Sequence, residues 1–163
     1  MLYILIVCAL IAADQGLKYW TVTHLAVGQS TRFLPGFMRL TRLHNTGAAW
    51  SSFSGKTTLL IVVTAVLLIG VLVVLARRIV RHPLGVAGCL LILGGGIGNI
   101  IDRIVRGYVV DMFDLELFTY PVFNLADCFV VVGAILGGIY YLFLYDKTDG
   151  KEKKHGPDAD GHK

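Results

Sequence analysis

The chain has 163 residues, of which 55% are hydrophobic and only 16% are charged, and its mean hydropathy is +0.69. Soluble domains carry about 25% charged residues, so this composition argues against a soluble domain and predicts a protein embedded largely in lipid. The net charge is +4, but the basic residues lie mostly at the ends of apolar runs, which favours membrane anchoring over nucleic-acid binding.

Four apolar segments are predicted to cross the membrane as helices, at about residues 1–20, 58–76, 84–105 and 124–145. The second segment is apolar except for Thr64, and at about 1.5 Å per residue it reaches roughly 27 Å, close to the thickness of a bilayer core. The first segment lacks a basic start and a small-residue cleavage site, so we interpret it as a retained helix and not as a secretory signal.

An even number of spans puts both chain termini on one side of the membrane. Arg77, Arg78 and Arg81 crowd the short connection between the second and third spans, and lysines follow the fourth. Positive charge next to spans favours the cytoplasmic side, so both termini are expected in the cytoplasm. The composition near the end changes to Lys, Asp, Gly and His, which predicts a disordered cytoplasmic tail at residues 146–163 after a membrane domain at residues 1–145.

Two longer segments, at about residues 23–55 and 106–122, are then left on the outer side. Apolar and polar residues alternate around Met38, and Pro35-Gly36 is typical of a turn. The first outer segment is therefore expected to contain short strands. The second carries acidic residues among large apolar ones and connects the third span to the fourth.

Two carboxylates stand at the edges of stretches meant for hydrocarbon. Asp111 directly follows the first apolar run of the second outer segment. Asp127 comes just before another apolar run, at the start of the fourth span. An ionisable group at membrane depth is costly and is rarely kept without a function. If the connecting segment folds back, the two carboxylates meet, cannot both ionise easily and share a proton. One can then deprotonate a water while the other donates to a carbonyl oxygen, which is the chemistry of peptide hydrolysis.

Polar and small residues share faces of the third and fourth spans. Asn99 and Arg103 lie on one helical stripe with Gly95, and Asn124 lies near the stripe of Asp127. Small residues let transmembrane backbones approach closely, and a lipid-facing charge is avoided. Both stripes are therefore expected to face the interior of the bundle.

The other titratable residues fit structural roles. Asp102 is interpreted as an ion-pair partner of Arg103 or Arg106, and Asp14 as the partner of Lys18 four residues later on the first helix. The five histidines are scattered and the three cysteines lie apart within apolar segments, so neither a metal site nor a cofactor is predicted. Two more acidic residues are read as interfacial charges: Asp114 and Glu116.

Five short motifs occur along the chain, and their combined order and spacing identify a protein family more specifically than any one motif alone. They are Asp14-Gln15 with Lys18, Asn45 to Ser51, Gly95 to Asn99 followed by Asp102-Arg103 and Gly107, Val109-Val110-Asp111, and Phe123 to Asp127. In these blocks the chain resembles the bacterial lipoprotein signal peptidases (signal peptidase II), a family of membrane aspartyl proteases. The resemblance covers essentially residues 1–145, with minor departures at Trp50, Met112 and Cys128.

The resemblance implies an all-α membrane protein with four transmembrane helices, a small extracytoplasmic β-sheet and a short lid helix. It also implies that Asp111 and Asp127 are the catalytic pair, and that Asp14 and Lys18 serve stability and substrate accommodation. The other matching positions would support or line the site: Asn45, Gly47, Asn99, Arg103, Asn124 and Ala126.

By the same resemblance, the enzyme removes the signal peptide of a prolipoprotein immediately before a cysteine that carries diacylglycerol. It would work without metal or cofactor in the bacterial cytoplasmic (inner) membrane, with its site toward the outer face. We expect a monomer in contact with membrane lipid and without a nucleic-acid partner.

Two other classes of function also fit an intramembrane carboxylate pair. A small proton-coupled transporter would need polar groups through the whole membrane depth, and the second and fourth spans offer almost none below Asp127. A structural membrane subunit would use the charges to bind a partner. In that case, replacing Asp111 or Asp127 by asparagine would disturb assembly and not turnover.

Overall fold

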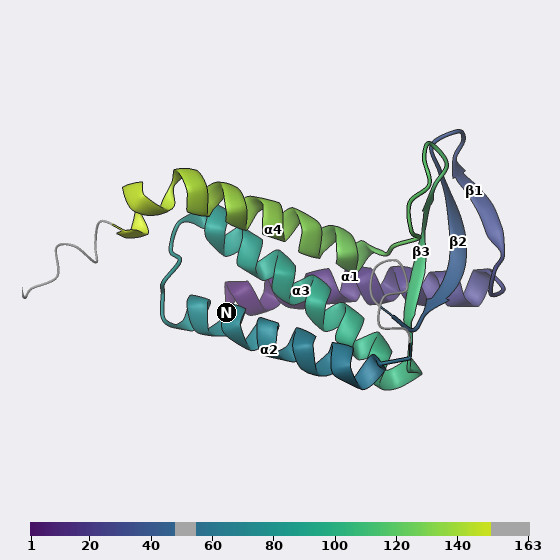
Figure 1. The fold of residues 1–163 in the computed structure, drawn as a ribbon, viewed down its shortest axis with the longest axis horizontal. Coiled ribbons are helices and arrows are strands. Elements are labelled where there is room, and N and C mark those ends of the chain that lie inside the picture. The colour runs from purple at the N-terminus through teal and green to yellow at the C-terminus, as the bar shows by residue number, and fades with distance from the viewer. Residues whose placement is uncertain (48–54, 151–163) are drawn as a thin grey trace, which may run out of the picture.

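The computed structural model describes residues 1–47 and 55–150. Four helices run along its long axis: α1 (Leu2–His24), α2 (Thr57–Ala76), α3 (Pro83–Arg106) and α4 (Leu125–Phe143) (Figure 1). Each is long and apolar enough to cross a membrane, which confirms the four predicted spans. Their outward side chains are mostly exposed and apolar, as expected for a surface that faces lipid.

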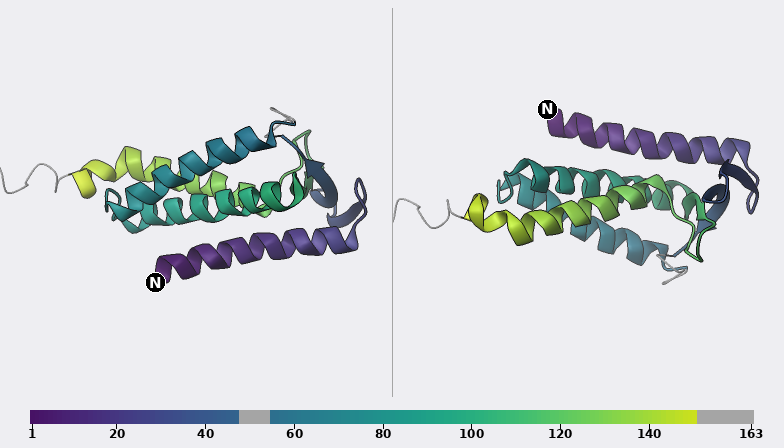
Figure 2. Two further views of the ribbon diagram at one scale, coloured as in Figure 1. Left: turned by 90° about the horizontal axis from the view of Figure 1, so that it is seen from below. Right: turned by 90° about the horizontal axis from the view of Figure 1, so that it is seen from above.

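Helix α3 is the centre of the bundle and packs against each of the other three helices. Figure 2 shows α1 and α2 on opposite sides of α3. Its ends are well defined, because Pro83 occupies its first turn and Gly107 ends it in a left-handed conformation with φ of 80°. Gly88, Gly95 and Asn99 are buried, so the predicted stripe of small and polar residues on this helix faces the interior.

Glycines bring α3 and α4 into close contact. A Cβ atom on Gly88 would lie 2.8 Å from the carbonyl oxygen of Gly133, and one on Gly133 would lie 2.7 Å from that of Gly88. A Cβ atom on Gly95 would collide with the carbonyl oxygen of Ala126 at the start of α4. Side chains at these positions would force the two backbones apart.

A three-stranded antiparallel sheet caps one end of the bundle (Figure 1). Its strands are β1 (Ser30–Leu34), β2 (Met38–Asn45) and β3 (Val109–Leu115), with β2 in the middle. The small sheet is as expected, and the second outer segment supplies its third strand. Pairing of β2 with β3 sets Leu43 opposite Asp111. The sheet thus holds Asp111 above the ends of α3 and α4.

Some expected boundaries shift. Helix α1 continues to His24, beyond the expected end near residue 20. The short lid helix is not found in the described parts of the outer segments, residues 25–47 and 107–124, and residues 48–54 lie outside the described chain, so it stays a prediction.

The segment after α4 also differs from the prediction, which placed the start of a disordered tail at residue 146. Tyr145–Lys147 form a 3-10 turn. The Asp149 carboxylate then accepts hydrogen bonds from the backbone nitrogens of Arg81 and His82 at 3.0 and 3.3 Å, which ties the chain to the α2–α3 connection. Residues 151–163 lie outside the described chain.

Candidate active site

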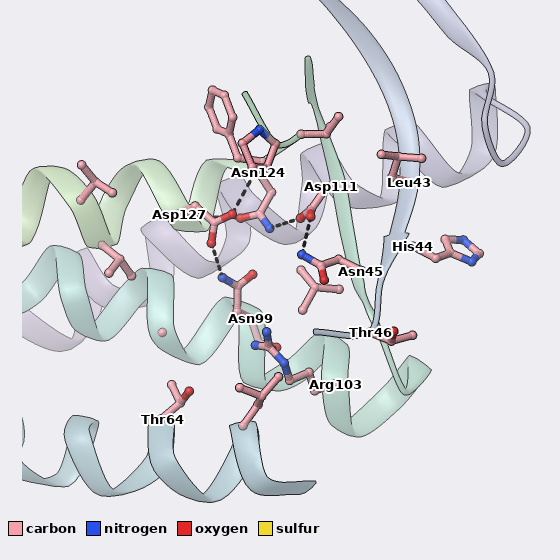
Figure 3. Close-up of a pocket in the computed structure, with 18 of the residues that line it drawn as sticks. Leu43, His44, Asn45, Thr46, Thr64, Asn99, Arg103, Asp111, Asn124 and Asp127 are labelled. Atoms are coloured by element: carbon pink, nitrogen blue, oxygen red, sulfur yellow. Dashed lines mark hydrogen bonds between the residues drawn. The ribbon is translucent and has the colours of Figure 1, made fainter. Parts of the chain in front are cut away.

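Asp111 and Asp127 come from different elements and line the same cavity. Asp111 is on β3 and is 2% exposed, while Asp127 is in the first turn of α4. Figure 3 shows Asn124 between them. The side-chain nitrogen of Asn124 donates to Asp111 Oδ1 at 2.7 Å, and its backbone nitrogen donates to Asp127 Oδ2 at 3.2 Å. One residue therefore holds both carboxylates.

The remaining oxygen of each carboxylate is held by a second asparagine. Asn45 Nδ2, at the end of β2, donates to Asp111 Oδ2 at 2.8 Å. Asn99 Nδ2, on α3, donates to Asp127 Oδ1 at 2.8 Å (Figure 3). All four carboxylate oxygens thus accept a hydrogen bond from the protein, which fixes the orientation of both groups and leaves further lone pairs for a proton or a water.

The surroundings of Asp111 raise the pKa of its carboxyl group toward neutral pH. Burial, followed by repulsion from the charge of Asp127, raises the pKa of Asp111 from 3.8 to about 7. Hydrogen bonds from Asn45 and Asn124 to the carboxylate pull the pKa in the opposite direction but do not outweigh burial. A carboxyl group with such a pKa exchanges its proton readily at physiological pH, as acid–base catalysis requires.

Arg103 and Gly47 shape the rim of the site. Arg103 Nη2 donates to the carbonyl oxygen of Gly47 at 3.1 Å, and Gly47 N donates to Asn45 Oδ1 at 2.9 Å. The arginine therefore holds the loop that orients the amide of Asn45. The rest of this sequence block, from Ala48 to Ser51 with Trp50, lies outside the described residues.

Asp14 and Lys18 lie in the protein interior, and their predicted ion pair is confirmed at 2.9 Å with both side chains inaccessible to solvent. Asp102 contacts Arg106 as expected, at 3.3 Å. It also lies 3.4 Å from Lys18 Nζ, a contact that the spacing along α3 did not indicate. Ala126 is completely buried and contributes its backbone nitrogen, which donates to Asp14 Oδ1 at 3.0 Å.

The cavity next to the carboxylates has a volume of about 650 Å³. Its polar end is formed by the two aspartates, the three asparagines and Arg103. Its apolar end runs between α2, α3 and α4 and is lined mainly by aliphatic residues: Leu60, Leu67, Leu68, Ile92, Val130 and Val131. Thr64, the polar residue that interrupts the apolar second span, also lines the cavity, although the sequence did not single it out as a site residue.

Among the described residues, no group of three or more His, Cys, Asp or Glu side chains is arranged to hold a metal ion. The site itself presents two hydrogen-bonded carboxyl groups beside an apolar cavity. Such a pair can accept a proton from a water and donate one to a leaving group.

Residues 6–143 match the family model described as signal peptidase II. A lipoprotein signal peptidase from Enterococcus faecalis is 38% identical over 156 residues, which is 96% of each chain. One from Lactiplantibacillus plantarum is 41% identical over 134 residues, covering 82% of this chain and 89% of that one. A solved structure described as a bacterial membrane enzyme superposes with a TM-score of 0.81 at 33% identity, covering 92% of both chains.

Proposed function

The chain belongs to the signal peptidase II family of membrane proteases, and we propose that it cleaves prolipoproteins by water activated between Asp111 and Asp127. Family membership favours the protease over the transporter and the structural subunit that the sequence left open. The proposed mechanism is supported by one observation above all. The two carboxylates line one cavity, and every carboxylate oxygen is already oriented by a hydrogen bond.

In the proposed reaction, the aspartate pair holds a single proton. The ionised member removes a proton from a water, and the oxygen of that water attacks the scissile carbonyl carbon while the protonated member donates to the carbonyl oxygen. The tetrahedral intermediate then collapses: one of its two hydroxyl groups returns its proton to the ionised aspartate as the carbonyl re-forms, the C–N bond breaks, and the leaving amine takes a proton from the other aspartate, so the pair again holds a single proton. Asn45, Asn99 and Asn124 hold the carboxylates in place, so little rearrangement is needed at each step.

The shape of the cavity fits a lipid-modified substrate. Its aliphatic end, between α2, α3 and α4, has the composition needed to accommodate acyl chains, while the polar end accommodates the peptide. We assign the diacylglyceryl group of the substrate cysteine to the aliphatic end. The enzyme would act as a monomer. Its lipid-modified substrate would enter the cavity laterally, from the bilayer.

The membrane orientation is also proposed. The α2–α3 connection, with its arginines, lies at the end of the bundle opposite the sheet (Figure 1). Positive charge in a short loop favours the cytoplasm, so the sheet and the aspartate pair belong at the outer face of the bacterial cytoplasmic membrane. Both termini would then be cytoplasmic.

The test compares purified wild type with Asp111→Asn and Asp127→Asn, using a diacylglyceryl-modified precursor and the same precursor without lipid. Each variant should lose at least about 10³-fold in kcat, because neither can exchange the proton, and should keep its fold. Asp114→Asn is the matched control, since Asp114 is on the same strand but pairs with Arg39 at 2.6 Å, away from the cavity. Full activity of either asparagine variant would remove that aspartate from the mechanism.

A further inference from the structure

A buried ion cluster lies beneath the aspartate pair. Lys18 Nζ contacts Asp14 Oδ2 at 2.9 Å, Asp102 Oδ2 at 3.4 Å and Asn99 Oδ1 at 2.9 Å. The side chains of Lys18, Asp14 and Asp102 are all inaccessible to solvent. Burying three charges is costly, and apolar side chains of similar volume are often as stable or more so. The cluster therefore calls for a role other than stability.

The two carboxylates of the cluster hold the backbone beside the two catalytic candidates. Asp14 Oδ1 accepts a hydrogen bond from the backbone nitrogen of Ala126, the residue before Asp127, at 3.0 Å. Asp102 Oδ2 accepts one from the backbone nitrogen of Val110, the residue before Asp111, at 2.9 Å. The same contact is thus made twice, once on α4 and once on β3.

Lys18 connects these two contacts and extends them to a third. Because it donates to the side-chain oxygen of Asn99, the amide group of Asn99 is left with its nitrogen toward Asp127. Space for the cluster comes from Gly98, where a Cβ atom would lie 2.6 Å from Asp14 Oδ2. Gln15 Nε2 adds a bond to Asp14 and one to the Gly98 carbonyl oxygen, both at 3.1 Å.

We propose that Asp14, Lys18 and Asp102 form one positioning unit that sets the distance and the relative orientation of Asp111 and Asp127. The unit links α1 and α3 to the two elements that carry the aspartates, so it fixes their backbones as well as the amide of Asn99. This proposal rests on the proposed function, in which the two aspartates must grip one water. The three residues are positioning residues, because their side chains are inaccessible to solvent and do not line the cavity.

The test separates position from charge at Asp102. Asp102→Asn keeps an oxygen acceptor for Val110 N and Lys18, whereas Asp102→Ala removes it with the same loss of charge. Misplacement by about 1 Å costs on the order of 10²-fold in rate, so Asp102→Ala should lose about 10²-fold in kcat with KM nearly unchanged. Asp102→Asn should recover most of that loss. The Asp14→Ala and Asp14→Asn pair should behave in the same way.

A second variant covers the case in which the alanine variants do not fold. Asp102→Glu retains the charge but lengthens the side chain, which displaces Val110 and with it Asp111, so kcat should fall while KM stays. Thr21→Ala is the control, because Thr21 is a buried polar residue on the same helix as Asp14 and its hydroxyl donates only to the Leu17 carbonyl oxygen, at 2.9 Å. Its kcat should match wild type.

Wild-type kcat in Asp102→Glu, or equal kcat in the alanine and asparagine variants of both positions, would overturn the positioning unit. Asp111→Asn and Asp127→Asn, measured in the same assay, separate this failure from a failure of the proposed function. If they are inactive while the positioning variants are fully active, only the positioning unit is wrong. If they are active, the aspartate mechanism itself is wrong.

Discussion

Asn124 and Asp127 cap each other at the start of α4. Asn124 Oδ1 accepts from the backbone nitrogen of Asp127 at 3.0 Å, and Asp127 Oδ2 accepts from the backbone nitrogen of Asn124 at 3.2 Å. The same two side chains face Asp111 across the cavity. The beginning of the fourth helix and the proposed active site are therefore one structure, and a single substitution can affect both.

Asn124 offers a way to separate the two roles. Asn124→Ala should lower stability by about 1 kcal/mol, the usual cost of a lost N-cap, and should also reduce kcat because Asp111 loses its bond at Oδ1. Asn124→Ser retains a capping oxygen but cannot donate to Asp111 as an amide does. It should therefore unfold close to wild type yet show the same loss of kcat. Thermal unfolding in detergent measures the effect on stability, and steady-state kinetics measure the effect on kcat. A serine variant with wild-type kcat would contradict the role of the Asn124 amide in orienting Asp111.

The raised pKa of Asp111 predicts how stability depends on pH. The folded protein keeps a proton on Asp111 up to about pH 7, whereas an unfolded chain releases it near 3.8. The folded state thus binds more protons in this window, so the contribution of Asp111 to the free energy of unfolding is present below pH 3.8 and is lost as pH rises through 7. Burial sets this shift first, and the charge of Asp127 adds to it.

The measurement is the thermal midpoint of wild type and of Asp111→Asn between pH 5 and pH 8. The difference between the two should shift in favour of the variant as pH rises, because asparagine has no proton to lose. Asp114→Asn should leave the wild-type pH dependence intact. A constant difference between wild type and Asp111→Asn across this range would mean that the buried carboxyl group is not protonated near neutral pH.

Much of the site could be predicted from the order of the spans and from local spacing. Asp111 and Asp127 line the same cavity because the third span ends on the side of the membrane where the fourth begins, and the ion pair of Asp14 with Lys18 follows from their separation of one helical turn. The second role of Asp102 could not be read in this way. Its nearby cations on α3 explained its charge, while its contacts with Lys18 and with the backbone of β3 depend on how α1 and the sheet pack.

The register of the sheet was also beyond local reading. Asn45 reaches Asp111 only because β2 and β3 pair with Asn45 opposite Val109, an arrangement between segments far apart in the chain. The resemblance to the family supplied Asn45 as a candidate, but the alternation of residues in the outer segment did not. Thr64 shows the opposite case, since its polarity was visible but nothing in the sequence placed it in a cavity.

Close contact between α3 and α4 predicts strong sensitivity at Gly95. A Cβ atom there meets the backbone of Ala126, which cannot move without shifting Asp127 on the next residue. Gly95→Ala should destabilise the protein by about 1–3 kcal/mol and should lower kcat in the molecules that still fold. Gly138→Ala, on α4 with open space around its Cβ position, is the control and should keep wild-type stability and activity. Equal midpoints for the two variants would contradict the tight α3–α4 contact.

Thr64 tests whether the aliphatic end of the cavity holds the lipid of the substrate. Thr64→Phe would fill part of that space, so KM for the diacylglyceryl-modified precursor should rise about tenfold, while kcat at saturation changes less because the aspartates are untouched. Val66→Phe adds the same bulk to α2 at a position that is 63% exposed and faces away from the cavity, and it should leave KM unchanged. Both variants should unfold like wild type. If the two phenylalanines raise KM equally, or if neither does, the acyl chains lie elsewhere on the protein.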